Sequence, residues 1–105
     1  MDQGQIVEIA QRYTDKVLNH MIAKKVVLYG SQVTGTANST SDIDIAVIVD
    51  HVGDDFLTTS AKLYKLRRNI DDRIEPILIQ EDEDQSGFLE EILKSGKVIY
   101  TQKTV

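Results

Sequence analysis

The chain has 105 residues, a formal net charge of −5, 41% apolar residues and no cysteine. This length predicts one domain, residues 1–105, with a modest hydrophobic core. The lack of cysteine excludes disulfides and thiolate metal sites, and the negative charge argues against a long nucleic acid as a partner, because binding to phosphates requires a surplus of cations.

No apolar stretch approaches the length of a membrane span. The polar residues 1–5 also lack the basic and apolar segments of a signal peptide. We therefore expect a cytoplasmic protein that makes no membrane contact.

The first half of the chain predicts a helix, a strand and a loop. Residues 5–24 carry apolar side chains at spacings of three and four, which is the period of an amphipathic helix. Residues 26–29 form a short apolar run that ends at Gly30, which indicates a buried strand. Residues 31–41 are rich in Ser, Thr, Gly and Asn, and this composition indicates a loop with room for one helical turn after Ser31.

The middle of the chain predicts two further strands with a helix between them. Residues 43–49 are apolar and mostly β-branched, which indicates a strand, and a turn follows at residues 52–55. Helical spacing returns over residues 56–70. Residues 73–80 indicate a third strand, in which Pro76 favours an edge position or a bulge because proline cannot donate to a sheet ladder.

The C-terminal part predicts an acidic turn at residues 81–84 and a last helix at residues 86–94. Gly96 is placed to act as the C-cap of that helix, and residues 98–100 form a short extended tail. The predicted fold is therefore α/β (α+β), with a small mixed three-stranded sheet flanked by helices in the order α-β-α-β-α-β-α.

A glycine-rich turn follows the first predicted strand. Gly30 and Ser31 end that strand, and Gly35 comes four residues after Ser31. Glycine lets a backbone approach a phosphate closely, and N–H groups at the start of a helical turn favour an anion. The spacing imitates part of a P-loop, but Thr36-Ala37 stands where a P-loop needs Lys followed by Ser or Thr. Taken alone, the segment is an ordinary strand-to-helix turn.

Two carboxylates begin the second predicted strand. Asp42 and Asp44 are two residues apart, so on a strand their side chains point to the same face, about 7 Å apart. Like charges this close repel, and Mg²⁺ or Mn²⁺ is the natural partner for such oxygen ligands. The alternative is a solvated strand start. Glu75 on the third strand is either exposed at the mouth of the sheet or, if the two strands are neighbours, a third carboxylate of the same site.

The run from Gly30 to Asp44 reads GSQVTGTANSTSDID. It resembles the signature of the polymerase-beta-like nucleotidyltransferase superfamily, and in particular of the minimal nucleotidyltransferases (MNT). These proteins carry Gly-Ser after the first strand, a glycine four residues past that serine, and Asp-x-Asp at the start of the second strand. The resemblance implies that Gly30 and Ser31 hold a triphosphate, with Gly35 shaping the turn. It also implies that Asp42 and Asp44 hold two Mg²⁺ or Mn²⁺ ions.

Glu75 falls where the family has a third carboxylate, which helps to bind the catalytic metal and to activate the acceptor hydroxyl. The implied reaction is attack of a hydroxyl on the α-phosphorus of a nucleoside triphosphate, ATP by family habit, with loss of pyrophosphate. Two departures bear on activity. Glutamate stands where many members have aspartate, which shifts the carboxylate by about 1.3 to 1.5 Å. Gln32 stands where many members have arginine, so triphosphate binding is expected to be weaker.

About sixty residues follow the Asp-x-Asp motif, too few for a separate acceptor-binding domain. The acceptor site is therefore open or completed by another chain, and a homo-oligomer remains an option. The resemblance implies a small helical HEPN protein as partner, in a toxin–antitoxin pair in which the nucleotidyltransferase acts as antitoxin, in some systems by attaching AMP to a tyrosine of the toxin. The alternatives are a non-catalytic antitoxin or binding module of the same fold, and a nucleotidyltransferase for a small molecule such as an antibiotic.

The remaining charged groups admit simpler interpretations. A basic cluster near the third predicted helix is either a solvated helix face or a contact for the triphosphate or an acidic partner. Its members are Lys62, Lys65, Arg67, Arg68 and Arg73. The acidic tract 81–84 lacks the spacing of an EF-hand and is interpreted as a solvated turn. His20 and His51 stand alone in the sequence and are interpreted as structural or surface residues.

Overall fold

The computed structural model describes residues 3–52, 55–83 and 86–103. Its centre is a four-stranded sheet with the strand order β3-β2-β1-β4. The strands are β1 (Lys25–Tyr29), β2 (Ile43–Val49), β3 (Ile74–Gln80) and β4 (Lys97–Thr101). Strand β2 runs parallel to β3, and β1 is antiparallel to both β2 and β4, so the sheet is mixed as predicted.

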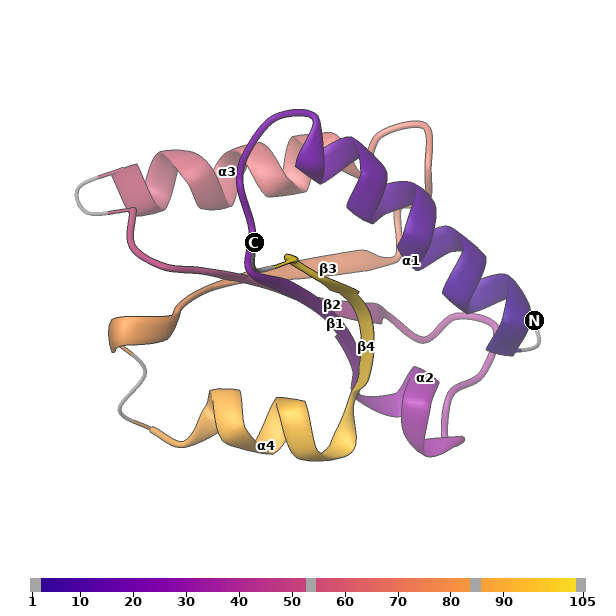
Figure 1. The fold of residues 1–105 in the computed structure, drawn as a ribbon. Helices are drawn as coiled ribbons and strands as arrows, with labels where there is room; N and C mark the ends of the chain where they lie inside the picture. Colours follow the sequence, from indigo (N-terminus) through magenta and orange to yellow (C-terminus); the bar gives the residue numbers. More distant parts are fainter. Residues whose placement is uncertain (1–2, 53–54, 84–85, 104–105) are drawn as a thin grey trace.

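The helices cover both faces of the sheet (Figure 1). The described segments contain α1 (Gln3–Leu18), α2 (Ser31–Thr34), α3 (Phe56–Leu66), α4 (Phe88–Ser95) and the 3₁₀ turn η2 (Glu81–Glu83). Helices α1 and α3 lie side by side on one face, and α4 lies on the other. The Tyr13 hydroxyl donates a hydrogen bond of 2.7 Å to the Leu63 carbonyl and so joins α1 to α3. None of the helices in the described ranges is long and apolar enough to cross a membrane.

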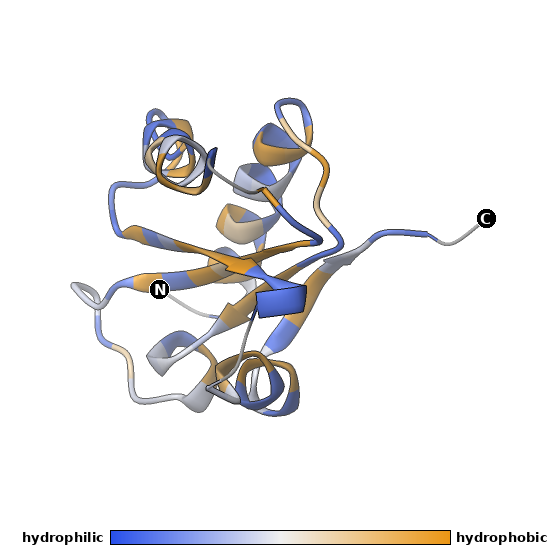
Figure 2. Cartoon of the chain, turned by 90° about the vertical axis from the view of Figure 1, so that its left-hand side faces the viewer, coloured by the Kyte–Doolittle hydropathy of each residue, from blue (hydrophilic) through white to orange (hydrophobic). Residues whose placement is uncertain are grey.

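The continuous apolar sequence of β2 follows from this three-layer arrangement. Ile43, Ile45 and Val47 belong to the core beneath α1 and α3. Ala46 and Ile48 belong to a second core beneath α4. A strand that is buried on both faces shows no alternation of apolar and polar residues. Figure 2 shows the hydrophobic strands between the two layers of helices.

The prediction of three strands was wrong by one. The segment predicted as an extended tail is the edge strand β4, which pairs with β1 through a register shift between Val26 and Val27. The apolar run of this strand, residues 98–100, is only three residues long and largely exposed, with Val98 44% accessible, so the sequence indicated an extended segment but not a place in the sheet. The predicted position of Pro76 is confirmed, since β3 is the opposite edge of the sheet.

The first predicted helix, residues 5–24, is too long at its C-terminal end. Helix α1 ends at Leu18, whereas the apolar pattern continues to residue 24. The reason is that Met21 and Ala23, which lie after the helix, pack against the same core. Because these two residues pack against the core, the apolar spacing in the sequence continues past the end of the helix.

Gly96 is the C-cap of α4, as predicted, but not because of a left-handed backbone. Its φ of −87° and ψ of 176° are extended, and its N–H donates to the Ile92 carbonyl at 2.7 Å. A Cβ at this position would lie 2.6 Å from Val27 Cγ1 and 2.8 Å from the Leu28 carbonyl oxygen. The glycine is needed because α4 approaches β1 closely.

We expect the Gly96→Ala variant to lose about 1 to 3 kcal/mol of unfolding free energy, because the added methyl group overpacks this contact. Urea denaturation followed by circular dichroism measures the loss. The matched control is Gly87→Asn at the other end of α4. Gly87 has a φ of 79° and open space around it, and asparagine tolerates the left-handed region. A Gly96→Ala variant as stable as the wild type would contradict the packing argument.

Candidate active site

The strand register brings the predicted carboxylates together. Strands β2 and β3 are parallel, and Asp44 pairs with Glu75. On the other side of β2, Asp44 pairs with Tyr29 of β1. Neighbouring strands lie about 4.8 Å apart, so the row Tyr29–Asp44–Glu75 crosses three adjacent strands. The condition set by the sequence, that the second and third predicted strands are neighbours, is met.

Asp44 and Glu75 project from the face of the sheet that α4 covers. Side chains two residues apart on a strand share a face, and Asp44 is two residues before Ala46 in the α4 core. Glu75 is likewise two residues before Ile77, which packs against that core. Asp42 comes one residue before β2 begins. The acids thus stand at the end of the sheet where β2 and β3 start.

The backbone around Asp42 is held from two sides. The Gln32 side-chain amide donates to the carbonyls of Ser41 at 3.3 Å and Asp42 at 3.2 Å. On the other side, Arg73 donates to the Ser39 carbonyl at 3.2 Å while it forms an ion pair of 2.8 Å with Asp71. Gln32 therefore ties α2 to the residues that lead into β2.

The turn between β1 and α2 places glycine against Asp44. Gly30 has a φ of 77° and a ψ of −153°, and a Cβ on it would collide with Asp44 Oδ2. Gly35 ends α2 in the left-handed conformation, with a φ of 84°, and its N–H donates to the Ser31 carbonyl at 3.2 Å. A hollow of about 270 Å³ opens beside this turn and is lined in part by Ser31, Gln32 and Gly35. The turn and the acids are thus in direct contact.

Glu75 has two partners on α3 and just after it. The Tyr64 hydroxyl donates a hydrogen bond of 2.9 Å to Glu75 Oε2, and Arg67 Nη1 lies 4.0 Å from Glu75 Oε1. The Arg67 guanidinium also stacks over the Tyr64 ring, 5.3 Å from its centroid. Arg67 is anchored by hydrogen bonds to the carbonyls of Asp72 at 2.8 Å and Ile74 at 3.0 Å.

Negative charge accumulates at this end of the sheet. Burial, followed by the charges of Asp42 and Glu75, raises the pKa of Asp44. Burial, followed by the charge of Asp44 and smaller contributions from neighbouring acids, raises the pKa of Tyr29 to about 12. The hydrogen bond to Glu75 raises the pKa of Tyr64. A divalent cation would relieve this repulsion, and a donor set made of carboxylates alone suits a hard cation such as Mg²⁺ or Mn²⁺.

The three acids are nevertheless spread more widely than a closed metal site. Within the described ranges, the group of three candidate ligands whose ligand atoms all lie within 4.8 Å of one another is His51, Asp82 and Glu83. Asp42, Asp44 and Glu75 do not meet that distance. Their mutual repulsion and the hydrogen bond that draws Glu75 toward Tyr64 both favour the wider spacing.

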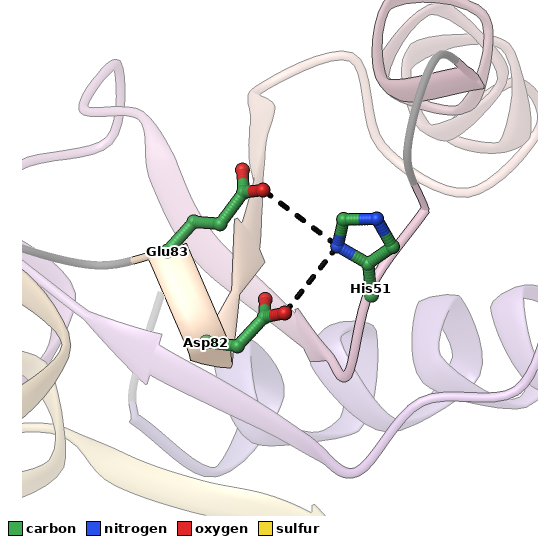
Figure 3. Close-up of side chains that lie close together, drawn as sticks. All are labelled: His51, Asp82 and Glu83. Atoms are coloured by element: carbon green, nitrogen blue, oxygen red, sulfur yellow. Dashed lines mark ion pairs between the residues drawn. The ribbon is translucent and has the colours of Figure 1, made fainter.

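The His51 cluster lies at the opposite end of the sheet (Figure 3). His51 follows β2, and Asp82 and Glu83 follow β3, so the carboxyl ends of two parallel strands bring them together. His51 Nδ1 is 3.4 Å from Asp82 Oδ2 and 3.7 Å from Glu83 Oε1. All three side chains are exposed. His51 is a surface residue, as interpreted, but in space it is not isolated, because the parallel order of the two strands brings it to Asp82 and Glu83.

The basic cluster divides into structural and solvated members. Arg67 and Arg73 are engaged with backbone carbonyls and acids, and the Arg73 guanidinium lowers the pKa of Asp71. Lys62 and Lys65 are exposed on α3. His20 hydrogen-bonds through Nδ1 to the Lys16 carbonyl at 2.9 Å, which confirms its interpretation as a structural or surface residue.

Comparison with known proteins bears on the fold and the family of the chain. A family model described as Polymerase beta, Nucleotidyltransferase matches residues 5–105. A candidate nucleotidyltransferase from Sulfolobus solfataricus has a similar structure, with a TM-score of 0.71 and 19% identity over 95% of this chain and 84% of that one. Among curated proteins the comparison found no match.

Two similar structures are of toxin–antitoxin systems. One is described as a toxin-antitoxin with AMP-PNP, and it has a TM-score of 0.64 and 25% identity over 89% of this chain and 74% of that one. The other is a mutant of the toxin–antitoxin MntA-HpeT, with two aspartates changed to glutamate. It has a TM-score of 0.57 and 19% identity over 98% of this chain and 76% of that one.

Proposed function

The chain belongs to the polymerase beta nucleotidyltransferase family, and on this premise we propose that it transfers a nucleoside monophosphate from a nucleoside triphosphate to a hydroxyl group in a metal-dependent reaction. The observation that carries the proposal is the contact of Asp44 with both the Gly30 turn and the Glu75 position of the adjacent strand. Phosphoryl chemistry depends mainly on positioning and charge neutralisation, which this arrangement can provide.

Each residue has a defined task in the proposed reaction. Asp42, Asp44 and Glu75 would hold two divalent metal ions, which would supply charge stabilisation to the transfer. Gly30 and Ser31 bind the triphosphate. Glu75 accepts the proton of the attacking hydroxyl, and the hydroxyl oxygen bonds to the α-phosphorus as pyrophosphate leaves.

We further propose that ATP is the nucleotide and that the acceptor is a protein. The likeness to a toxin-antitoxin structure with AMP-PNP, an ATP analogue, supports both choices. The proposed partner is a small helical HEPN-type toxin, and the proposed effect of attaching AMP to a tyrosine of it is neutralisation. The net charge of −5 supports a protein rather than a long nucleic acid as acceptor. We place the reaction in the cytoplasm, where ATP is available.

One competing function is favoured by a specific observation. Glu75 is already engaged by Tyr64 and Arg67, and Gln32 stands in place of a cation. Both features suit an antitoxin that binds its toxin without catalysis. A small-molecule transferase would place label on a low-molecular-weight product instead of a protein.

Metal-dependent nucleotide binding distinguishes a functional transferase site from a site that has lost its function. In titration calorimetry with an ATP analogue that resists cleavage at the α-phosphorus, we expect the wild type to bind only when Mg²⁺ or Mn²⁺ is present. Asp42→Asn should weaken the binding about 10- to 100-fold. The matched control is Asp82→Asn in the His51 cluster, which should bind as the wild type does. Binding without metal, or equal weakening in both variants, would contradict the assignment.

A further inference from the structure

The Tyr64 hydroxyl occupies an unusual position for a surface tyrosine. It donates a hydrogen bond of 2.9 Å to Glu75 Oε2, and the residue is 41% accessible to solvent. A carboxylate accepts hydrogen bonds, so the phenol is the donor. A general base must lie within about 2.6 to 3.2 Å of the proton that it removes. Tyr64 therefore meets the distance required of an acceptor hydroxyl for Glu75.

The acids lie between this hydroxyl and the expected phosphate site. Glu75 pairs with Asp44 across β3 and β2, and Asp44 Oδ2 adjoins Gly30 at the end of β1. Across the sheet the groups therefore follow in a fixed spatial order. The Tyr64 phenol comes first, then the Glu75 and Asp44 carboxylates, and last the turn at Gly30. An in-line displacement needs the attacking oxygen, the phosphorus and the leaving oxygen in a row, so a triphosphate that extends from the Gly30 turn across the acids would bring its α-phosphorus to the Tyr64 oxygen.

Arg67 fixes the phenol in this position. Its guanidinium stacks over the Tyr64 ring at 5.3 Å and lies 4.0 Å from Glu75 Oε1, while two backbone carbonyls hold it in place. A cation over the ring also offsets the negative charge that develops on the phenol oxygen as its proton leaves.

The other tyrosines of the chain are placed differently. Tyr13 is buried and its hydroxyl donates to the Leu63 carbonyl. Tyr29 pairs with Asp44, one strand further from Glu75, and its ring packs edge-on against Phe88, with 5.9 Å between the centroids. Tyr100 lies on β4, whose partner β1 separates it from β2 and β3. The position of a nucleophile beside Glu75 thus belongs to Tyr64.

We infer that Tyr64 is itself an acceptor, so that the protein nucleotidylates its own chain. This inference rests on the proposed transferase function and adds to it a specific modification site. In the step, the Tyr64 oxygen forms a bond to the α-phosphorus of a nucleoside triphosphate, the bond from the α-phosphorus to the bridging oxygen breaks, and pyrophosphate leaves with that electron pair. The phenol proton passes to Glu75. No oxidant or further reactant is required.

The test is to incubate the full chain alone with Mg²⁺ or Mn²⁺ and ATP labelled at the α-phosphate. Intact mass and peptide mapping then locate any added nucleotide. We expect one AMP on Tyr64 of the wild type and at least a tenfold loss of label in Tyr64→Phe, which removes only the hydroxyl. Tyr100→Phe is the matched control and should keep the label. Mapping on the wild type makes the result independent of how the variants fold.

A parallel sample with cell extract of the source organism separates the two proposals. If the protein labels a component of the extract and stays unlabelled itself, the self-modification is refuted and the transferase function stands. Label at a residue other than Tyr64 also refutes the assignment. If neither the chain nor the extract takes up label, both proposals fail.

Discussion

The Asp44→Asn variant is expected to lose nucleotide transfer by about a hundred- to a thousandfold and yet to unfold at a higher temperature than the wild type. The loss follows from the removal of the central carboxylate from the proposed site, where a single preorganised group is worth on the order of 10²- to 10³-fold. The gain in stability follows from the repulsion that Asp44 suffers from Asp42 and Glu75.

The direction of the pKa shift determines the pH dependence of this gain. Burial and the neighbouring acids raise the pKa of Asp44, so the folded protein binds its proton more tightly than the unfolded chain does. Ionised Asp44 therefore lowers stability at pH values above its folded pKa, and this penalty disappears as the pH falls to the ordinary carboxyl range. The stabilisation by Asp44→Asn should be present at pH 7 and vanish below about pH 4.

Thermal unfolding in metal-free buffer between pH 4 and pH 8 measures the effect, which we expect to be a few degrees. The matched control is Asp50→Asn, because Asp50 lies 3.2 Å from Lys24 in an exposed ion pair at the other end of β2. That variant should change stability by less than about 0.5 kcal/mol and leave transfer unchanged. An Asp44→Asn protein that is less stable than the wild type at pH 7 would contradict the electrostatic account.

The second large effect is expected for Gly30→Ala. The added Cβ would collide with Asp44 Oδ2, and the residue would keep a φ of 77° that alanine disfavours. The strained backbone costs about 1 to 2 kcal/mol. Displacement of the carboxylate by about 1 Å is expected to lower transfer on the order of 100-fold.

Gly35→Ala isolates the contribution of the contact with Asp44. Gly35 has a similar φ of 84° but nothing within 4 Å of a Cβ. It should therefore show the backbone cost in urea denaturation and a much smaller loss of transfer. Equal transfer by the Gly30→Ala and Gly35→Ala variants would show that the contact between Gly30 and Asp44 does not matter.

The fold could be predicted largely because its strands carry strong local patterns. The predicted second strand, residues 43–49, has the bounds of β2, and the edge position indicated by Pro76 is confirmed. Residues 98–100 were predicted to be extended, but their place in the sheet was not, since a short exposed edge strand depends on its pairing with β1. The predicted turns at residues 52–55 and 81–84 lie partly outside the described residues, at 53–54 and at 84.

Only those residues of the candidate site that belong to a sequence motif could be predicted from the sequence. Gly30, Asp42 and Asp44 stand close together in the sequence, so their spacing points to a common site. Tyr64 and Arg67 carry no motif, and their contact with Glu75 depends on how the end of α3 packs against β3. Their roles, like those of the three acids, remain predictions until activity is measured.

The central claim, that the chain transfers a nucleotide through the Asp42–Asp44–Glu75 site, is tested most directly by label transfer. The purified protein is incubated with Mg²⁺ and cell extract of its source organism, with ATP labelled either at the α-phosphate or at the γ-phosphate, and Asp44→Asn and Asp50→Asn run beside the wild type. We predict that α-label alone enters a protein band, with the wild type and Asp50→Asn but not with Asp44→Asn. Transfer of γ-label, undiminished transfer by Asp44→Asn, or no transfer to any acceptor would contradict the claim.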